Sequence, residues 1–257
     1  MSTILERIAA TKREEVAELR RRGCADTRSA PVRDILAALR DRQPIGLIAE
    51  LKKASPSRGV IRADFDAQCL ARAYADGGAH VLSILTDRQY FQGDAVYLRQ
   101  ARDACPLPVL RKDFIIHELQ VRESAGMNAD AVLLIVAMLE QSQLEDLYAY
   151  CCAHALTPLV EVHDEREMER ACALHAALVG INNRDLHTFN VDVATTERVA
   201  RYALPEMLLV SESGIFTADD ITRVRAAGAT AVLVGESLMR QDDVAAAVHA
   251  LLRTSRD

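Results

Sequence analysis

The sequence lacks the segments that would place a protein in a membrane or on nucleic acid. No stretch approaches the ~18 uncharged apolar residues of a membrane span, and charges of both signs begin at residue 6, where a signal peptide would have its apolar core. The net charge of −6 argues against the basic surface that nucleic-acid binding needs. We therefore expect a cytoplasmic protein that binds neither nucleic acid nor a membrane.

Metal-binding and disulfide spacings are absent as well. The six cysteines include no CxxC pair, and the seven histidines form no HExxH motif. Most of the cysteines lie in apolar or helical segments, where a free structural thiol is the common case. We expect free thiols and no metal site.

Linkers and low-complexity tracts are missing too, and the chain instead alternates between two kinds of segment. Short aliphatic or β-branched runs are each followed by a stretch with helical periodicity. The runs predict strands at 45–51, 80–85, 108–112, 131–136, 157–162, 178–182, 207–211 and 231–234.

Strict alternation of strands and helices requires a parallel sheet with crossover helices. Eight repeats at nearly regular spacing favour a closed (β/α)8 TIM barrel over an open, doubly wound α/β sheet. Two helical patterns precede the first strand. The sequence therefore predicts one domain over residues 1–257, with a helical N-terminal extension at 1–42 and the barrel at 45–253.

Polar residues end several of the predicted strands, where (β/α)8 barrels carry their chemistry. Glu50 and Lys52 are two residues apart, so both side chains lie on one face of the first strand and point toward the barrel mouth. The same alternation directs further polar residues to one side of their strands: Lys112, Glu161, Asn182, and Ser211 with Ser213.

Each of these charges alone is typical of a solvated loop. Four charged residues at one rim are costly to desolvate unless they are paired or used, which favours a catalytic group. Two glycine turns, at Gly214 and Gly235, follow the last two strands and precede helices. Either glycine alone indicates a plain turn, but the pair in this position favours phosphate binding by backbone N–H groups.

Longer segments resemble the indole-3-glycerol-phosphate synthase family of tryptophan biosynthesis. The most specific are "IAELKKASPSRG" (48–59), "PVLRKDFI" (108–115), "PLVEVHDEREM" (158–168) and "VGINNRDLHTF" (179–189), and the matching segments span nearly the whole chain. The resemblance implies a carboxy-lyase that needs no cofactor. Its reaction converts 1-(2-carboxyphenylamino)-1-deoxyribulose 5-phosphate into indole-3-glycerol phosphate, CO2 and water.

The resemblance also implies roles for the polar residues. Lys112 matches the general acid of ring closure, Lys52 meets the anthranilate carboxylate and is a candidate acid for dehydration, and Glu161 matches the general base. The order of the two lysine roles stays open. Other residues of the same site hold the lysines and the substrate or line the pocket: Glu50, Asn182 and Ser213.

The substrate-binding positions follow from the same resemblance. Phosphate is expected to meet Ser55, Gly214, Gly235 and Glu236. Further substrate-lining positions are Arg184 and Leu186, with Phe91 and Phe114 at the anthranilate ring. The alternative for the two phenylalanines is packing in the core or in a lid.

Two other functions compete. Phosphoribosylanthranilate isomerase uses a cysteine after the first strand, but here the nearest following cysteine, Cys69, lies far into a helix. A non-catalytic phosphosugar-binding barrel could keep the glycine turns and dispense with Lys112 and Glu161. We expect a monomer that binds a phosphorylated small molecule, with a weak dimer as the alternative.

The N-terminal extension has two interpretations. It could cap the bottom of the barrel or, as the resemblance suggests, form a flap over the mouth. Apolar residues Ile4, Ile8, Val16 and Leu19 form one stripe, and the arginines at 20–22 could neutralise an anionic substrate or simply lie solvated at a helix C-terminus.

Overall fold

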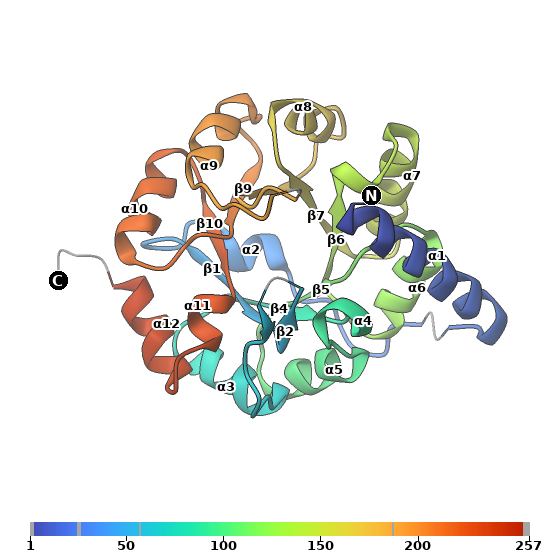
Figure 1. The fold of residues 1–257 in the computed structure, drawn as a ribbon, viewed down its shortest axis with the longest axis horizontal. Helices are drawn as coiled ribbons and strands as arrows, with labels where there is room; N and C mark the ends of the chain where they lie inside the picture. Colours follow the sequence, from blue (N-terminus) through green and yellow to red (C-terminus); the bar gives the residue numbers. More distant parts are fainter. Residues whose placement is uncertain (1–2, 25–26, 57, 187, 254–257) are drawn as a thin grey trace.

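The structure is a computed structural model that describes residues 3–24, 27–56, 58–186 and 188–253. Its eight barrel strands are parallel and close in the order β1-β10-β9-β8-β7-β6-β5-β4 (Figure 1). They are β1 (Gly46–Leu51), β4 (Val81–Leu85), β5 (Val109–Lys112), β6 (Ala131–Ile135), β7 (Thr157–Val162), β8 (Leu178–Asn182), β9 (Leu208–Glu212) and β10 (Ala231–Val234). Each end lies within one residue of its predicted position, and the (β/α)8 fold is confirmed.

Helices surround the barrel (Figure 1). The ring consists of α3 (Ala67–Asp76), α5 (Ala95–Ala104), α6 (Glu118–Gly126), α7 (Gln141–Ala153), α8 (Glu165–Ala173), α9 (Ala194–Val199), α10 (Ala218–Ala226) and α12 (Val244–Leu252). Several begin at an aspartate whose side chain accepts a hydrogen bond from the first turn, as Asp66 does in α3 and Asp164 does in α8.

Shorter elements occupy the connections. They are the hairpin β2 (Ala54–Ser55) and β3 (Gly59–Val60), the helices α4 (Arg88–Phe91) and α11 (Glu236–Met239), and the 3-10 turns η1 (Val136–Met138) and η2 (Ala200–Tyr202). The hairpin, α4 and α11 follow the carboxyl ends of β1, β4 and β10, so they border the barrel mouth.

Strand side chains alternate between the barrel interior and the helices. On β1, Ile48 packs inside the barrel, whereas Leu47 and Ala49 belong to the core between strands and helices. Leu110 on β5 and Leu159 on β7 share the interior with Ile48. Side chains on a strand alternate with a period of two. The residue two positions after each of these interior residues therefore also points inward, and it lies at the barrel mouth.

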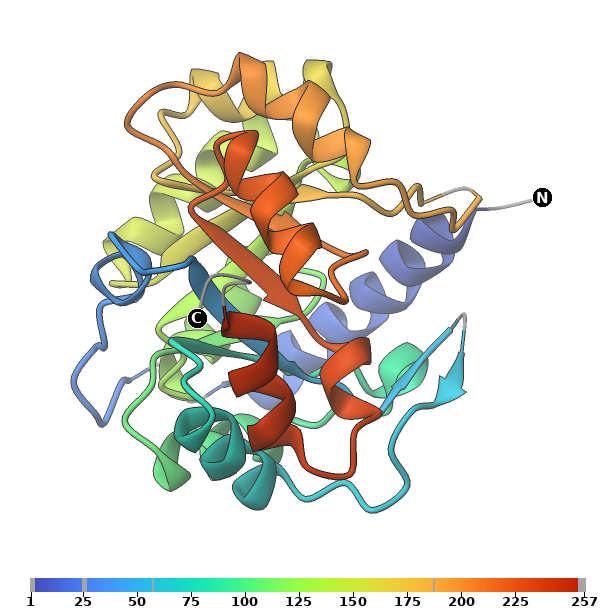
Figure 2. The ribbon, with the colours of Figure 1, turned by 90° about the vertical axis from the view of Figure 1, so that its left-hand side faces the viewer.

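The N-terminal extension covers both ends of the barrel. Helix α2 (Ile35–Leu39) lies at the bottom, where Ile35 and Leu39 are fully buried among residues that begin the strands. Helix α1 (Ile4–Arg22) lies at the other end, and Figure 2 shows the two helices on opposite sides of the barrel. The position at the bottom of the barrel is therefore that of α2, and the position over the mouth is that of α1. Residues 1, 2, 25 and 26 of the predicted extension lie outside the described residues.

Two of the three arginines at the end of α1 contact the region of α6. Arg20 Nη2 lies 3.1 Å from His117 Nε2, and Arg22 Nη2 donates to Glu123 Oε1 at 2.8 Å. Neither arginine lines the cavity at the mouth. These contacts dock α1 on α6 rather than placing cations over a substrate.

Candidate active site

A cavity of about 200 Å³ opens at the carboxyl ends of the strands. All of the residues predicted for the site line it: Glu50, Lys52, Ser55, Phe91, Lys112, Phe114, Glu161, Asn182, Arg184, Leu186, Ser213, Gly214, Gly235 and Glu236. Helix α1 contributes Ile4, Leu5 and Ile8 to the same lining. The cavity is therefore bounded by the barrel rim and by the N-terminal helix.

Lys112 ends β5 at the centre of the charged groups. Its Nζ donates to Glu161 Oε2 and to Glu212 Oε2, each at 2.8 Å. Burial alone would lower the pKa of Lys112, but the carboxylates of Glu161, Glu212 and Glu50 raise it above its ordinary value. The ammonium therefore stays protonated and can donate a proton only to a strongly basic atom beside it.

The two carboxyl groups on Lys112 differ because their other neighbours differ. Burial alone would raise the pKa of Glu161, but Lys112 and His163 lower it well below the usual range. His163 Nε2 lies 3.3 Å from Glu161 Oε1, and its Nδ1 lies 3.0 Å from Glu167 Oε2. Burial would lower the pKa of His163, but hydrogen bonds to these two carboxylates raise it to about 10. Glu161 therefore remains ionised.

Glu212 ends β9 and has no second cation beside it in the described structure. Burial raises its pKa, Lys112 opposes the rise, and the charges of Glu161 and Glu50 add to it, giving a pKa of about 7. A glycine faces this carboxyl group: a Cβ at Gly180 would lie 2.1 Å from Glu212 Oε1. Close approach of the carboxyl group to β8 thus requires glycine at position 180.

Replacing Glu212 by glutamine should change how stability depends on pH. A carboxyl whose pKa rises from 4.5 to about 7 on folding takes up a proton between those values, so this group makes the wild type less stable as pH rises through that window. Glu212→Gln has no carboxyl group to titrate, so it does not lose stability in this way. The Tm of the variant minus the Tm of wild type should therefore be larger at pH 8 than at pH 5. Thermal unfolding at both pH values measures the difference.

The control is Glu169→Gln, which changes an exposed glutamate on α8. Its Tm difference from wild type should be the same at both pH values. A constant difference for Glu212→Gln as well would contradict a raised pKa at Glu212.

A second ion pair lies across the mouth. Glu50 Oε1 is 2.6 Å from Lys52 Nζ, and both residues face the cavity as the alternation of β1 predicts. Gly235 sits against this pair, because a Cβ at that position would lie 2.6 Å from Glu50 Oε1. The turn after β10 and the first catalytic candidate on β1 therefore touch.

Asn182 links the base candidate to the loop after β9. Its Nδ2 donates to Glu161 Oε1 at 3.2 Å, and its Oδ1 accepts from Ser213 Oγ at 2.9 Å and from the N–H of Arg184 at 3.1 Å. Glu161, Asn182 and Ser213 are thus held in one hydrogen-bonded row.

The prediction for the segment after β9 is wrong in one respect. Ser211 and Ser213 do not share a face: Ser211 is buried on the outer side, where Asn183 Nδ2 donates to its Oγ at 3.0 Å. Ser213 has a φ of +65°, which turns the chain and brings both Glu212 and Ser213 to the cavity. Glu212 was missed for this reason, although strict alternation from the interior residue Val210 identifies it.

Aromatic side chains form one wall. The rings of Phe91, in α4, and Phe114, two residues after β5, have centroids 5.9 Å apart and planes inclined by 37°. Both side chains are half-buried and line the cavity. Together they offer an apolar face beside Lys112.

The glycine turns form the opposite wall. Gly214 has a φ of +81°, the left-handed region that favours glycine, and Gly235 immediately precedes α11. The carboxylate of Glu236 is already paired with Arg240 at 2.9 Å. Backbone N–H groups, rather than this side chain, are therefore available to an anion at the turn.

The described ranges contain no cluster of metal ligands, no cysteine at the cavity and no membrane-spanning helix. No group of three or more His, Cys, Asp or Glu side chains there could hold a metal ion. All six cysteines are free thiols, as expected, and none lines the cavity. None of the helices in that part of the chain has both the length and the apolar character needed to span a bilayer.

A parallel barrel with a half-buried lysine between carboxylates, facing two glycine turns, is typical of enzymes of the (β/α)8 class. Comparison with known proteins gives the family. The model of the family "Indole-3-glycerol phosphate synthase" matches residues 5–251, and the chain belongs to this family. Its members bind a phosphorylated small molecule and are decarboxylating carbon–carbon lyases.

Individual relatives agree. The indole-3-glycerol phosphate synthase of Shouchella clausii is 48% identical over 98% of this chain and 98% of its own length. That of Desulfotalea psychrophila is 50% identical over 93% of this chain and 95% of its own. Among solved structures, a 3-hexulose-6-phosphate synthase has a TM-score of 0.64 at 17% identity, covering 81% of this chain and 98% of that one, which shows a shared fold.

Proposed function

We propose that the protein converts 1-(2-carboxyphenylamino)-1-deoxyribulose 5-phosphate into indole-3-glycerol phosphate, CO2 and water, as a lyase of tryptophan biosynthesis. The observation that carries the chemistry is Lys112, half-buried between Glu161 and Glu212 at the barrel mouth. Ring closure needs an acid at the ketone oxygen, and the later loss of water needs a base for the ring proton. Lys112 and the carboxylates beside it supply both within one cavity.

Lys112 is proposed as the general acid. As the aromatic carbon attacks the ketone, negative charge develops on the ketone oxygen, which then becomes basic enough to take a proton from the ammonium. The paired carboxylates that raise the pKa of Lys112 keep it charged until that moment. Glu212 is proposed to anchor the ammonium on the side opposite Glu161.

Glu161 is proposed as the general base. Loss of CO2 from the attacking carbon returns the bonding electrons to the benzene ring. In the dehydration that follows, the hydroxyl leaves as water and a proton is removed from the new ring as the indole becomes aromatic. Glu161 is ionised and ready to accept that proton. Asn182 donates to its Oε1 at 3.2 Å and so fixes the direction in which Oε2 points. Ser213 in turn holds Asn182.

Lys52 supplies the second cation of the site. We propose that it meets the anthranilate carboxylate and is a candidate acid for the loss of water, while Glu50, 2.6 Å away, holds it in place. Phe91 and Phe114 are proposed to enclose the anthranilate ring, with Arg184 and Leu186 on the far side of the cavity.

The phosphate group is proposed to bind Ser55 and the turns at Gly214, Gly235 and Glu236, which line the same cavity. We expect Gly214→Val to raise KM more than it lowers kcat, because it blocks a phosphate-facing turn. Gly235→Val should raise KM and also lower kcat, since its side chain would meet Glu50 Oε1. Steady-state kinetics with inorganic phosphate as a competitor measures both effects.

Gly228→Val is the matched control. It has a φ of +103°, so valine is strained there too, but no atom lies within 4 Å of the added Cβ and the residue is outside the cavity. Equal kinetic changes in Gly214→Val and Gly228→Val would show that strain, not phosphate binding, is responsible for the effect at Gly214.

The function is tested by incubating the protein with the carboxyphenylamino substrate and following indole fluorescence. Turnover supports the proposal. Binding without turnover would indicate a non-catalytic phosphosugar-binding barrel instead. An isomerase with a cysteine base is not favoured, because Cys69 is exposed on α3 and does not line the cavity.

We further propose that the protein acts as a cytoplasmic monomer that does not bind nucleic acid. The residues proposed to act on the substrate all belong to one chain, so the proposed chemistry needs no residue from a second copy. The six free thiols suit a reducing compartment, and the net charge of −6 does not favour nucleic acid.

A further inference from the structure

Lys12 is buried in the middle of the apolar stripe of α1. The buried residues of this helix are Ile8, Lys12, Val16 and Leu19, so a lysine occupies a position where the helical period calls for an apolar side chain. Its side chain is 1% exposed. A buried ammonium is costly unless it is paired, so its partners must explain it.

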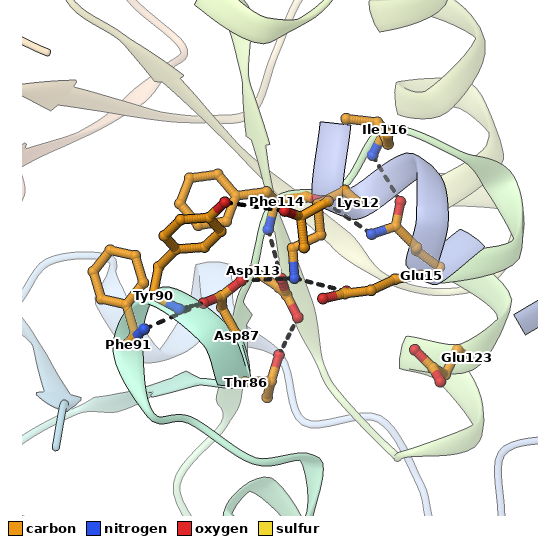
Figure 3. Close-up of polar contacts among 12 residues, drawn as sticks. Lys12, Glu15, Thr86, Asp87, Tyr90, Phe91, Asp113, Phe114, Ile116 and Glu123 are labelled. Carbon is orange, nitrogen blue, oxygen red and sulfur yellow. Dashed lines mark hydrogen bonds and ion pairs between the residues drawn. The ribbon is translucent and has the colours of Figure 1, made fainter. Parts of the chain in front are cut away.

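The partners are two aspartates on neighbouring loops of the barrel mouth. Lys12 Nζ lies 2.8 Å from Asp87 Oδ2 and 2.8 Å from Asp113 Oδ1, and Figure 3 shows it reaching between them. Glu15 Oε2 is the third acceptor, at 2.9 Å. Burial alone would lower the pKa of Lys12, but Asp113 and Asp87 raise it above its ordinary value.

Asp87 organises the loop after β4. Its Oδ1 accepts from the N–H of Tyr90 at 2.7 Å and of Phe91 at 3.2 Å, which starts α4. Its Oδ2 is buried and has the ion pair with Lys12 in place of any hydrogen bond found in the described structure. Asp87 therefore holds the backbone of Phe91 through Oδ1, and the charge on its buried Oδ2 is balanced by Lys12.

Asp113 organises the loop after β5 and follows Lys112 directly. Its Oδ1 accepts from the N–H of Phe114 at 2.8 Å, and its Oδ2 accepts from Thr86 Oγ1 at 2.6 Å. Burial would raise its pKa, but Arg111 and Lys12 lower it to about 2. The carboxylate thus stays charged and joins Lys12 to the backbone N–H of Phe114 and to the side chain of Thr86, which follows β4.

We propose that Lys12 is a positioning residue that couples the seating of α1 over the mouth to the geometry of Lys112 and of the Phe91–Phe114 wall; the inference rests on the proposed function. The ammonium of Lys12 contacts both loops, at Asp87 just after β4 and at Asp113 just after β5. Thr11 Oγ1, beside it, lies 3.0 Å from Tyr90 Oη and ties α1 to α4 a second time. Arg20 and Arg22, by contrast, contact His117 and Glu123 of the α6 region.

Lys12→Met tests the inference, because methionine keeps an unbranched apolar stem and removes the charge. We expect kcat to fall by ~10 to 10²-fold, the cost of a displaced catalytic group. The affinity for inorganic phosphate, measured by calorimetry, should stay within about twofold, since the phosphate turns follow β9 and β10. Arg20→Met is the control for a lost α1 cation and should keep wild-type kcat.

A second variant separates positioning from folding. Lys12→Met with Asp87→Asn removes the carboxylate that Lys12→Met leaves unpaired, while asparagine still accepts from Tyr90 and Phe91. We expect this double variant to recover Tm toward wild type but to retain the low kcat. Recovery of kcat together with Tm, or equal kcat in Lys12→Met and Arg20→Met, would overturn the inference. A wild-type protein without turnover would instead contradict the proposed function.

Discussion

Lys112→Met is expected to reduce kcat by at least the ~10²- to 10⁴-fold typical of a lost general acid. The reason is geometric: the described cavity has one lysine placed between Glu161 and Glu212, and Lys52 is held by Glu50 instead. Inorganic phosphate should still bind, because the glycine turns are unchanged. Indole fluorescence gives the rate, and calorimetry gives the phosphate affinity.

Lys53→Met is the matched control for Lys112. Lys53 is half-buried beside Lys52 but does not line the cavity, so its replacement should leave kcat unchanged. A Lys112→Met variant that keeps the wild-type kcat would rule out Lys112 as the acid. Lys52 would then be the remaining candidate in the cavity.

Removal of the proposed base gives the second large effect. Glu161→Gln preserves shape and can still accept from Asn182, but it cannot take a proton, so kcat should again fall by ~10²- to 10⁴-fold. Because Lys112 and His163 hold the pKa of Glu161 well below the usual range, the wild type should show no loss of base near neutral pH. Steady-state rates between pH 6 and 9 measure both points.

Glu212→Gln provides the comparison within the same site. Both variants remove one carboxylate from Lys112. A fall in kcat common to both therefore measures the effect of disturbing the lysine. Any further fall in kcat in Glu161→Gln measures the loss of the base. If Glu212→Gln proves the more damaging of the two, Glu212 is the base and Glu161 is its support. Glu169→Gln, on the exposed face of α8, should match wild type.

The sequence by itself determined the barrel and most of its mouth. Alternating strand and helix patterns admit few topologies, and the carboxyl ends of parallel strands meet at one face. A side-chain period of two then directs Glu50, Lys52, Lys112, Glu161 and Asn182 into a common cavity, where the structure places them. These are local rules, so they can be read from neighbouring residues alone.

Only the tertiary structure shows where the alternation of side chains ends and how each carboxyl group is paired. The positive φ of Ser213 breaks the alternation after β9, so Glu212 and Ser213 both face the cavity while Ser211 does not. The different pKa values of Glu161 and Glu212 depend on which cation stands beside each buried carboxyl group, and no motif encodes that.

The N-terminal extension shows the same limit over a longer range. An apolar stripe predicts that α1 packs on something, but not on which end of the barrel. Lys12 within the stripe is the local sign of a buried partner, yet that partner is a pair of carboxylates, Asp87 and Asp113, far along the chain. Only the folded barrel brings the loops after β4 and β5 together, because their pairing depends on strand order rather than on adjacent sequence.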